Sequence, residues 1–397
     1  MALSSRTVDR RTLLRSTALA AAGPLLPGTA RARTAEGRTL RLPPPTGPCP
    51  LGVTTLYLVD RRRRDPWDGS PMREVMVSVF YPALSTHGHP VTRQLTPQAV
   101  PHFQDIDVPV HGLPVSGVDW AATRTHAHLG APARPERRPV LLYSPGGGDP
   151  RTLGTSLAEE LAGHGRVVVT VDHPGDGSEV EFPVPRKGRK LVRDTILRAD
   201  PRDDPRLFRA LIDIRIADLR FVLDQLAELA AGRNPDAAGR PLPKHLGRAL
   251  DLRRVGVYGH SAGGTAVAEV MHRDRRVAAA VNLEGYLDQP SGELFPVARD
   301  GADRPLLLLG TDGFQGRPYE SSWAATLAHS HGHAGRDRLG HARHWVFTDY
   351  AALAPQLQAA GLMSPESRDR LVGTVDPARS VPAVRDRLGA FFARHLG

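Results

Sequence analysis

The sequence predicts an α/β fold in which helices flank a mostly parallel central sheet. From residue 139 onward, short apolar runs alternate with helix-forming stretches, which is the pattern of parallel strands joined by helices. The run PVLLYS is continuously apolar, as strands covered on both faces are, and RVVVTVDHP is expected to form the next strand. Hydrophobic residues make up 40% and charged residues 24% of the 397 residues. This composition predicts a globular chain with a sizeable core.

The region before this alternation predicts a different kind of strand. TTLYLVD and REVMVSVFYPA combine β-branched and aromatic residues with partial alternation, so we expect N-terminal antiparallel strands at the edge of the sheet. Residues 84–135 are rich in Pro, His and Gly, and we expect them to form a long surface excursion. The helix LIDIRIADLRFVLDQLAEL and the strands VAAAVNLEG and PLLLLGT follow later, with no internal repeat and no linker. We therefore predict a single domain over residues 33–397, with its core in 136–397.

The N-terminus has the features of an export signal. The twin arginines Arg10 and Arg11 precede a mild apolar stretch, STALAAAGPLLPG, and then Ala30-Arg31-Ala32 offers small residues to a signal peptidase. The apolar stretch is short and contains two prolines, which makes it a poor transmembrane span. We expect residues 1–32 to be a twin-arginine signal peptide and the protein to be secreted or held in the cell envelope.

Charge and cysteine content exclude several classes of protein. The chain has 52 Lys+Arg against 42 Asp+Glu, a net charge of +10, but its one dense basic run, residues 61–64, is flanked by acids and lacks base-stacking aromatics. We therefore expect no nucleic acid partner. Cys49 is the single cysteine, which excludes an internal disulfide and a multi-cysteine zinc site. The histidines at 329, 331 and 333 have no close acidic partner, so we expect no metal and no cofactor.

A candidate nucleophile lies where a predicted strand meets a predicted helix. Gly259-His260-Ser261-Ala262-Gly263 matches G-x-S-x-G, between the strand RRVGVYG and the helix-forming SAGGTAVAEVM. The serine of this motif lies on a turn so tight that side chains two residues away on either side would collide, which explains both glycines. The turn also exposes the Ser261 hydroxyl at a helix N-terminus, where developing negative charge is stabilised. This motif in this context predicts the α/β-hydrolase fold.

A serine hydroxyl needs a histidine base and an acid that orients the base. In this fold the chain order is serine, acid, histidine. His344, in HARHWVFTD, is the best-placed base, and His341 is its main rival. Glu284 ends the strand after the elbow helix, and Asp312 ends the next strand. Topology alone favours Asp312, and the residues themselves leave the choice of acid open.

The reaction also needs backbone N–H groups that stabilise the oxyanion. Ala262, directly after the serine, is expected to supply one of them. The second is expected from the loop after PVLLYS, which reads Pro145-Gly146-Gly147-Gly148. A phosphate-binding loop is the alternative interpretation of these glycines, but no G-K-[ST] follows them.

Several motifs in one order resemble a known family. SPGGGDPRTLGTSLAEELAGHG, VVTVDHP, GVYGHSAGG, VNLEGYLDQ, LLLLGTDGFQ and HWVFTD are similar to segments of the plasma and intracellular type II platelet-activating factor acetylhydrolases and their bacterial lipase-like relatives. The resemblance runs from about residue 45 to the C-terminal region. It implies Ser261 as nucleophile, His344 as base and Glu284, where many members have aspartate, as acid. It also places Gly147 at the second oxyanion donor, although Pro145 replaces the family's usual histidine.

The resemblance implies a carboxylic ester hydrolase acting on lipid-like or short-acyl phospholipid esters. The N-terminal signal predicts that this enzyme is exported, and the net positive charge predicts transient contact with a lipid surface. Two alternatives stay open: a polyester or peptide hydrolase with the same triad, and a non-catalytic binding protein of the same fold. Residues 179–208 form a polar, charge-rich insertion. They are expected to be either a cap over the site or a plain surface loop.

Overall fold

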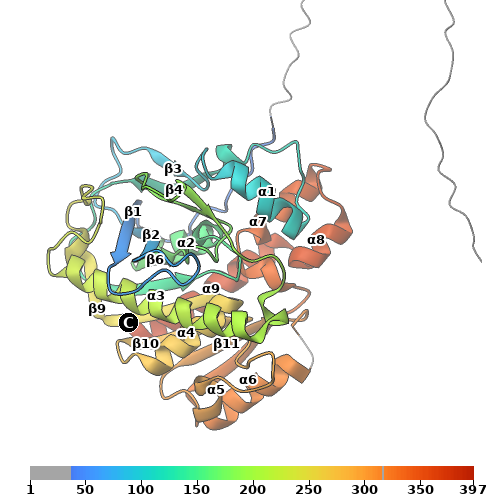
Figure 1. Ribbon diagram of the computed structural model, residues 1–397. Helices are drawn as coiled ribbons and strands as arrows, with labels where there is room; N and C mark the ends of the chain where they lie inside the picture. Colours follow the sequence, from blue (N-terminus) through green and yellow to red (C-terminus); the bar gives the residue numbers. More distant parts are fainter. Residues whose placement is uncertain (1–36, 315–316) are drawn as a thin grey trace, which may run out of the picture. The chain divides into compact units, whose positions relative to one another are not determined.

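A computed structural model of the chain describes residues 37–314 and 317–397 (Figure 1). The expected signal peptide, 1–32, lies outside the described residues. The described part contains a ten-stranded sheet in the order β12-β11-β10-β9-β5-β6-β2-β1-β4-β3 and a separate β7–β8 pair. The strands are β1 Leu51–Asp60, β2 Arg73–Pro82, β3 Val91–Arg93, β4 Arg124–Leu129, β5 Arg138–Ser144, β6 Val167–Val171, β7 Glu179–Glu181, β8 Val192–Asp194, β9 Leu250–His260, β10 Val277–Leu283, β11 Leu306–Thr311 and β12 Ala334–Leu339.

The six strands from β12 to β6 are parallel to one another, as the apolar runs predict. Nine α-helices occur among the described residues. They are α1 Val100–His111, α2 Thr155–Gly163, α3 Pro205–Ala230, α4 Ala262–Arg273, α5 Pro296–Asp300, α6 Arg317–His329, α7 Tyr350–Ala359, α8 Pro365–Val372 and α9 Pro377–Leu396. The expected α/β architecture with a mostly parallel central sheet flanked by helices is confirmed.

Both faces of the central strands are buried, each in its own apolar cluster. On β5, Val140 and Leu142 pack in the cluster that contains the apolar residues of α3 and α4. Leu141, which points the opposite way, packs in the cluster that contains residues of α2 and α9. The helices therefore cover the sheet from both sides, and the carboxyl ends of the parallel strands are left to carry the loops of a site.

The N-terminal part differs from the sequence expectation in two respects. β1 and β2 are antiparallel as expected, but they lie inside the sheet, because β4 pairs with β1 and β3 pairs with β4. Residues 84–135, expected to be a surface excursion, contain these two strands and α1, and they bury Phe103 and Trp120 in a third apolar cluster. The proline and histidine content concealed this structure, since it disturbs any periodic pattern.

The insertion at 179–208 contains the β7–β8 hairpin and a 3₁₀ turn, Pro201–Asp203, before α3 begins. Among the described residues, no helix is both long and apolar enough to cross a membrane.

Candidate active site

Ser261 lies on a strained turn between β9 and α4. Its φ and ψ are 55° and −123°, and it is the N-cap residue of α4. The glycines around it are required by close packing: a Cβ at Gly259 would lie 2.4 Å from backbone atoms of Gly263, and one at Gly263 would lie 2.0 Å from the carbonyl oxygen of Ser144. The Ser261 N–H donates to the Leu283 carbonyl at 2.8 Å, which fixes the turn against β10. The local structure is therefore the nucleophile elbow that the motif predicts.

His344 and Glu284 meet beside this turn. His344 begins the 3₁₀ helix His344–Phe347, and Glu284 directly follows β10. Nδ1 of His344 lies 2.7 Å from Oε2 of Glu284, the distance of a charge-assisted hydrogen bond. The Glu284 side chain is 1% exposed and that of His344 is 28% exposed. A buried carboxylate thus fixes the orientation of a partly accessible imidazole, whose Nε2 is left for other chemistry.

Asp312 and His341 form a different, more exposed contact. Asp312 Oδ2 accepts the backbone N–H of His341 at 2.6 Å, and its Oδ1 lies 3.3 Å from Arg338 Nε. The Asp312 side chain is 38% exposed. The structure therefore brings Glu284, and not Asp312, to the imidazole of His344.

A cavity of about 760 Å³ lies at the turn that carries Ser261. Ser261, Glu284 and His344 line it together with Gly147 and Ala262. The remaining wall comes from α1, the glycine loop, the 179–208 insertion, α3, α4 and the segments after β10, β11 and His344: Asp105, Ile106, Asp107, Pro109, Val110, His111, Gly148, Asp149, Thr195, Leu197, Arg198, Ala199, Asp200, Pro201, Arg202, Phe208, Thr265, Tyr286, Gly313, Phe314 and Trp345. The insertion therefore borders the site, which the sequence left undecided.

Comparison with known proteins agrees with this geometry. Residues 115–362 match the family model described as platelet-activating factor acetylhydrolase, isoform II. The chain belongs to this family. The family assignment confirms the resemblance seen in the sequence and makes the protein a carboxylic ester hydrolase with an α/β-hydrolase fold, acting on small-molecule esters.

Individual relatives of the chain are named as esterases or acetylhydrolases. A probable 1-alkyl-2-acetylglycerophosphocholine esterase of Arthroderma benhamiae is 28% identical over 88% of this chain and 87% of its own. The platelet-activating factor acetylhydrolase of Gallus gallus is 21% identical over 66% of this chain and 63% of its own. Among solved structures, a ferulic acid esterase from Streptomyces cinnamoneus has a TM-score of 0.70 and 32% identity, covering 90% of this chain and 94% of its own.

Within this acetylhydrolase-family site, His260 is a residue that the sequence did not single out. Its side chain is fully buried, and its ring lies 4.3 Å from that of His344 between centroids. Burial, and then the neighbouring His344, lower the pKa of His260. His260 Nε2 lies 3.0 Å from the His344 carbonyl oxygen, and since a carbonyl only accepts, Nε2 carries the hydrogen. His260 thus supports the backbone that presents His344.

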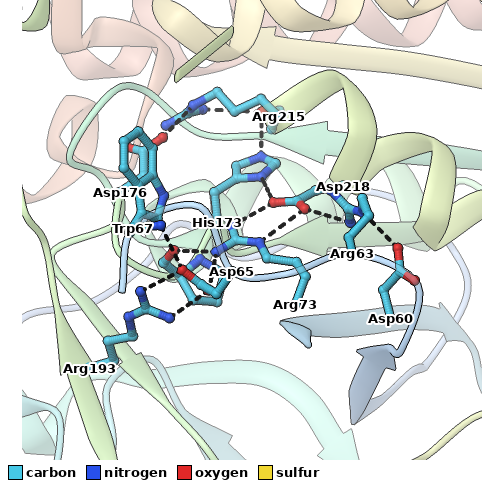
Figure 2. A network of polar contacts seen from close by, with 12 residues as sticks. Asp60, Arg63, Asp65, Trp67, Arg73, His173, Asp176, Arg193, Arg215 and Asp218 are labelled. Carbon is cyan, nitrogen blue, oxygen red and sulfur yellow. Dashed lines mark hydrogen bonds and ion pairs between the residues drawn. The ribbon is translucent and has the colours of Figure 1, made fainter. Parts of the chain in front are cut away.

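An ionic network that includes Arg215, Asp176, His173 and Asp218 (Figure 2) is joined to the glycine loop of the site by Arg215. Arg215 of α3 is fully buried and donates to the carbonyl oxygens of Pro145 and Gly146 and, at 2.6 Å, to Asp176. On the far side of the network, Asp218 accepts from Arg73 at 2.7 Å and contacts His173 Nδ1 at 3.0 Å. These residues come from segments that are far apart in the sequence, so sequence reasoning did not bring them together.

Proposed function

We propose that this esterase works through an acyl-enzyme on Ser261, with His344 as base and Glu284 as the acid that orients it. The observation that supports the proposal is the 2.7 Å contact between His344 Nδ1 and buried Glu284, in the wall of the cavity that also contains Ser261. In this scheme Ser261 Oγ attacks the ester carbonyl while His344 Nε2 takes its proton. The imidazolium then returns the proton to the leaving alcohol.

The second half of the reaction repeats the first with water. A water molecule gives a proton to His344 Nε2 and attacks the acyl-enzyme, and Ser261 leaves as the free hydroxyl. In both halves the N–H groups of Gly147 and Ala262 are proposed to stabilise the oxyanion. Both residues line the cavity, and Ala262 begins α4, whose N-terminus favours negative charge.

For the substrate we propose an ester of lipid-like character, with a short-acyl phospholipid as the leading case. The names of the Arthroderma and Gallus relatives support an ester on a glycerophospholipid. The cavity wall supports it too, since Leu197, Ile106 and Val110 are apolar and two arginines, Arg198 and Arg202, stand among them. Guanidinium groups recognise phosphate. Val110 is 69% exposed, which supports a transient contact with a lipid surface.

An aromatic acyl ester is the second candidate. The solved structure with 32% identity is that of a ferulic acid esterase. In this protein, Tyr286 and Phe314 pack edge to face with ring centroids 5.5 Å apart in the cavity wall, and Trp345 also lines the cavity. Such rings offer a planar acyl group a surface to pack against.

The proposed nucleophile can be tested with a fluorophosphonate probe. We expect the probe to label the wild-type protein once, and we expect no labelling of Ser261→Ala. Labelling that survives in Ser261→Ala would remove this residue from the mechanism and would also decide against the triad.

The substrate can be tested by comparing kcat/KM over a panel. The panel contains a phospholipid with a short second acyl chain, a methyl ester of a hydroxycinnamic acid, nitrophenyl esters of rising chain length and an aminoacyl anilide. We expect the phospholipid and the short nitrophenyl esters to be the best substrates. A preference of more than about tenfold for the hydroxycinnamate would favour the aromatic ester instead, and hydrolysis of the anilide alone would indicate a peptidase.

We further propose that the protein is exported by the twin-arginine route, on the basis of Arg10, Arg11 and the residues that follow them. Replacement of both arginines by lysine is expected to leave the precursor inside the producing cell. Export that continues in the double variant would contradict the proposal.

A further inference from the structure

Three buried side chains beside the active site face one another without direct hydrogen bonds. Asp107 and His111 are one turn apart on α1, and Asp149 follows the glycine loop. His111 Nε2 lies 3.6 Å from Asp107 Oδ1 and 3.5 Å from Asp149 Oδ1. Both distances exceed those of ordinary N–H···O bonds. Each of the three side chains is at most 5% exposed.

Polar atoms around these three residues have no partners. Asp107 Oδ2 is buried and has no hydrogen bond, and neither has His260 Nδ1. His260 Nδ1 lies 3.6 Å from Asp149 Oδ2, while the other ring nitrogen, Nε2, donates to the His344 carbonyl oxygen. A buried polar atom without a hydrogen bond costs free energy unless a ligand satisfies it.

The three side chains bring two carboxylates and one imidazole together at a buried position, with their ligand atoms all within 4.8 Å of one another. Buried charges are normally paired or bound to a metal.

We propose that Asp107, His111 and Asp149 form a binding site for a divalent transition-metal ion of the zinc type. Zinc binds nitrogen and carboxylate oxygen at about 2.0–2.2 Å, so neighbouring ligand atoms in a tetrahedral site lie about 3.3 Å apart. The observed 3.5 and 3.6 Å separations need only a slight contraction.

The mixed donor set selects among metals. Two carboxylates and imidazole nitrogen suit zinc or cobalt, whereas calcium prefers a site built of oxygen alone. The three residues line the active-site cavity, which gives an ion a route to the site. A bound ion would link α1, which carries Asp107 and His111, to Asp149, which follows the glycine loop. Asp149 packs closely on that loop, since a Cβ at Gly146 would lie only 2.4 Å from Asp149 Oδ2.

The test is zinc binding by the full chain, stripped with a chelator and dialysed into metal-free buffer. Isothermal titration with Zn²⁺ is expected to give one tight site per chain, and Ca²⁺ is expected to give none. Co²⁺ is expected to produce the visible absorption of a four- or five-coordinate ion. His111→Gln and Asp107→Asn are each expected to weaken zinc binding more than about a hundredfold. Asp105→Asn, an exposed aspartate on the same helix, is the matched control and is expected to bind as the wild type does.

The exposed histidines at 329 and 331 offer an adventitious site, so a double His→Gln variant there is the second control. Zinc binding that disappears in this double variant but survives in His111→Gln would overturn the proposal. Absence of a stoichiometric zinc site in the wild type would do so as well. The wild-type titration and the cobalt spectrum decide the question even where a variant fails to fold, and neither depends on the proposed reaction.

A separate observation concerns Arg215, and it rests on the proposed function. The carbonyl of Gly146 and the N–H of Gly147 belong to one trans peptide group, so the two bonds point in opposite directions. Arg215 holds the Gly146 oxygen at 2.7 Å from the interior. Asp176, bound to Arg215, accepts the N–H of Gly148 at 2.9 Å. These contacts turn the Gly147 N–H away from the interior, toward the cavity that Gly147 lines.

We infer that Arg215 is a positioning residue, which orients and polarises the peptide that stabilises the oxyanion. Arg215→Lys keeps the positive charge but loses the planar set of N–H donors of the guanidinium group, and Arg215→Met loses both. We expect kcat to fall about tenfold to a hundredfold in each variant, with KM changed less than about threefold. The affinity for a boronic acid inhibitor, which resembles the tetrahedral intermediate, is expected to fall in parallel with kcat.

The control is Arg209→Met, on the exposed side of the same helix. Asp176→Asn, a milder change in the same network, is expected to give a smaller loss of the same kind and serves if the Arg215 variants do not fold. Unchanged kcat, or a lower kcat with unchanged boronate affinity, would overturn the positioning role. If Ser261→Ala were nevertheless inactive, the proposed mechanism would stand and only the role of Arg215 would fall.

Discussion

The ends of β10 and β11 each carry a carboxylate, and the two differ in depth. Glu284, after β10, is 1% exposed and bonds an imidazole, whereas Asp312, after β11, is 38% exposed and bonds a backbone N–H. Both follow buried parallel strands at the same edge of the sheet. The difference shows that the position of a residue at a strand end does not by itself make it part of a site. What matters is which loop covers that strand end, and here the segment that begins at His344 covers Glu284.

The largest expected effect separates the two histidines. His344→Ala is expected to lower kcat by about 10⁵-fold or more, because loss of the base disables the whole triad. His341→Ala, whose backbone and not its ring bonds Asp312, is expected to stay within about threefold of the wild type. Steady-state kinetics with a nitrophenyl ester measures both. Comparable losses of kcat in the two variants would show that the groups at the two strand ends do not differ in their contribution to catalysis.

The next largest effect is expected from the carboxylates at the two strand ends. Glu284→Gln is expected to lower kcat by about 10³- to 10⁴-fold, since an amide cannot stabilise the imidazolium and favours the wrong tautomer. Asp312→Asn keeps an oxygen for the His341 N–H and is expected to change kcat less than about threefold. If Asp312→Asn lost more activity than Glu284→Gln, the acid would be the residue after β11, as topology alone predicts, and not the residue that contacts His344.

Burial also determines how much a charged side chain outside the site contributes to the free energy of unfolding. The side chain of Asp65 is 1% exposed and pairs with Arg73 and Arg193, while that of Asp68 is 47% exposed and lies 3.4 Å from Arg193. Asp65→Asn is expected to lower the free energy of unfolding by about 3–5 kcal/mol, because it leaves buried guanidinium charge unpaired. Asp68→Asn is expected to cost less than about 1 kcal/mol. Urea denaturation at pH 7 compares the two variants directly.

The Asp65 contribution should also depend on pH. Burial raises the pKa of Asp65, but Arg193 and Arg73 outweigh burial and lower it from 3.8 to about 2. The stabilisation is therefore fully present above about pH 4 and is lost as the pH falls through 2. Wild type and Asp65→Asn should converge in stability over that range, and a constant difference down to pH 2 would assign the effect to packing.

The smallest expected effect tests how closely the acid must fit. Glu284→Asp shortens the side chain by one methylene group and withdraws the carboxylate from His344. We expect kcat to fall about tenfold, because the charge persists at a longer distance. A loss as large as that of Glu284→Gln would show that the contact distance, and not the charge, controls the orientation of the imidazole.

The sequence predicted the parts of this molecule whose causes are local. The turn at Ser261 could be predicted because glycines at 259 and 263 and the adjoining strand and helix all fall within one short segment. The central strands could be predicted because burial on both faces requires continuous apolar runs. The pairing of Glu284 with His344 could not be derived from the residues alone, since it depends on the path of the chain over the sixty residues between them.

The missed features have non-local causes. Arg215 is fully buried, yet nothing in the amphipathic pattern of α3 distinguishes it from the helix's exposed arginines. Asp107 and His111 lie in a stretch whose prolines made a helix hard to recognise. β12 reads AGRDRL and has no apolar run, because it lies at the end of the sheet with little burial.

The two outermost strands have a consequence for the behaviour of the protein at high concentration. A long, apolar edge strand invites a second chain to add its own strand by backbone hydrogen bonding. Here one end of the sheet is β12, with Arg336, Asp337 and Arg338 at its centre, and the other is β3, three residues long. A strand added at either edge would have to desolvate charge or would find few bonding partners. We therefore expect this broad sheet to resist edge-to-edge aggregation, with β12 as the place where apolar substitutions would remove that protection.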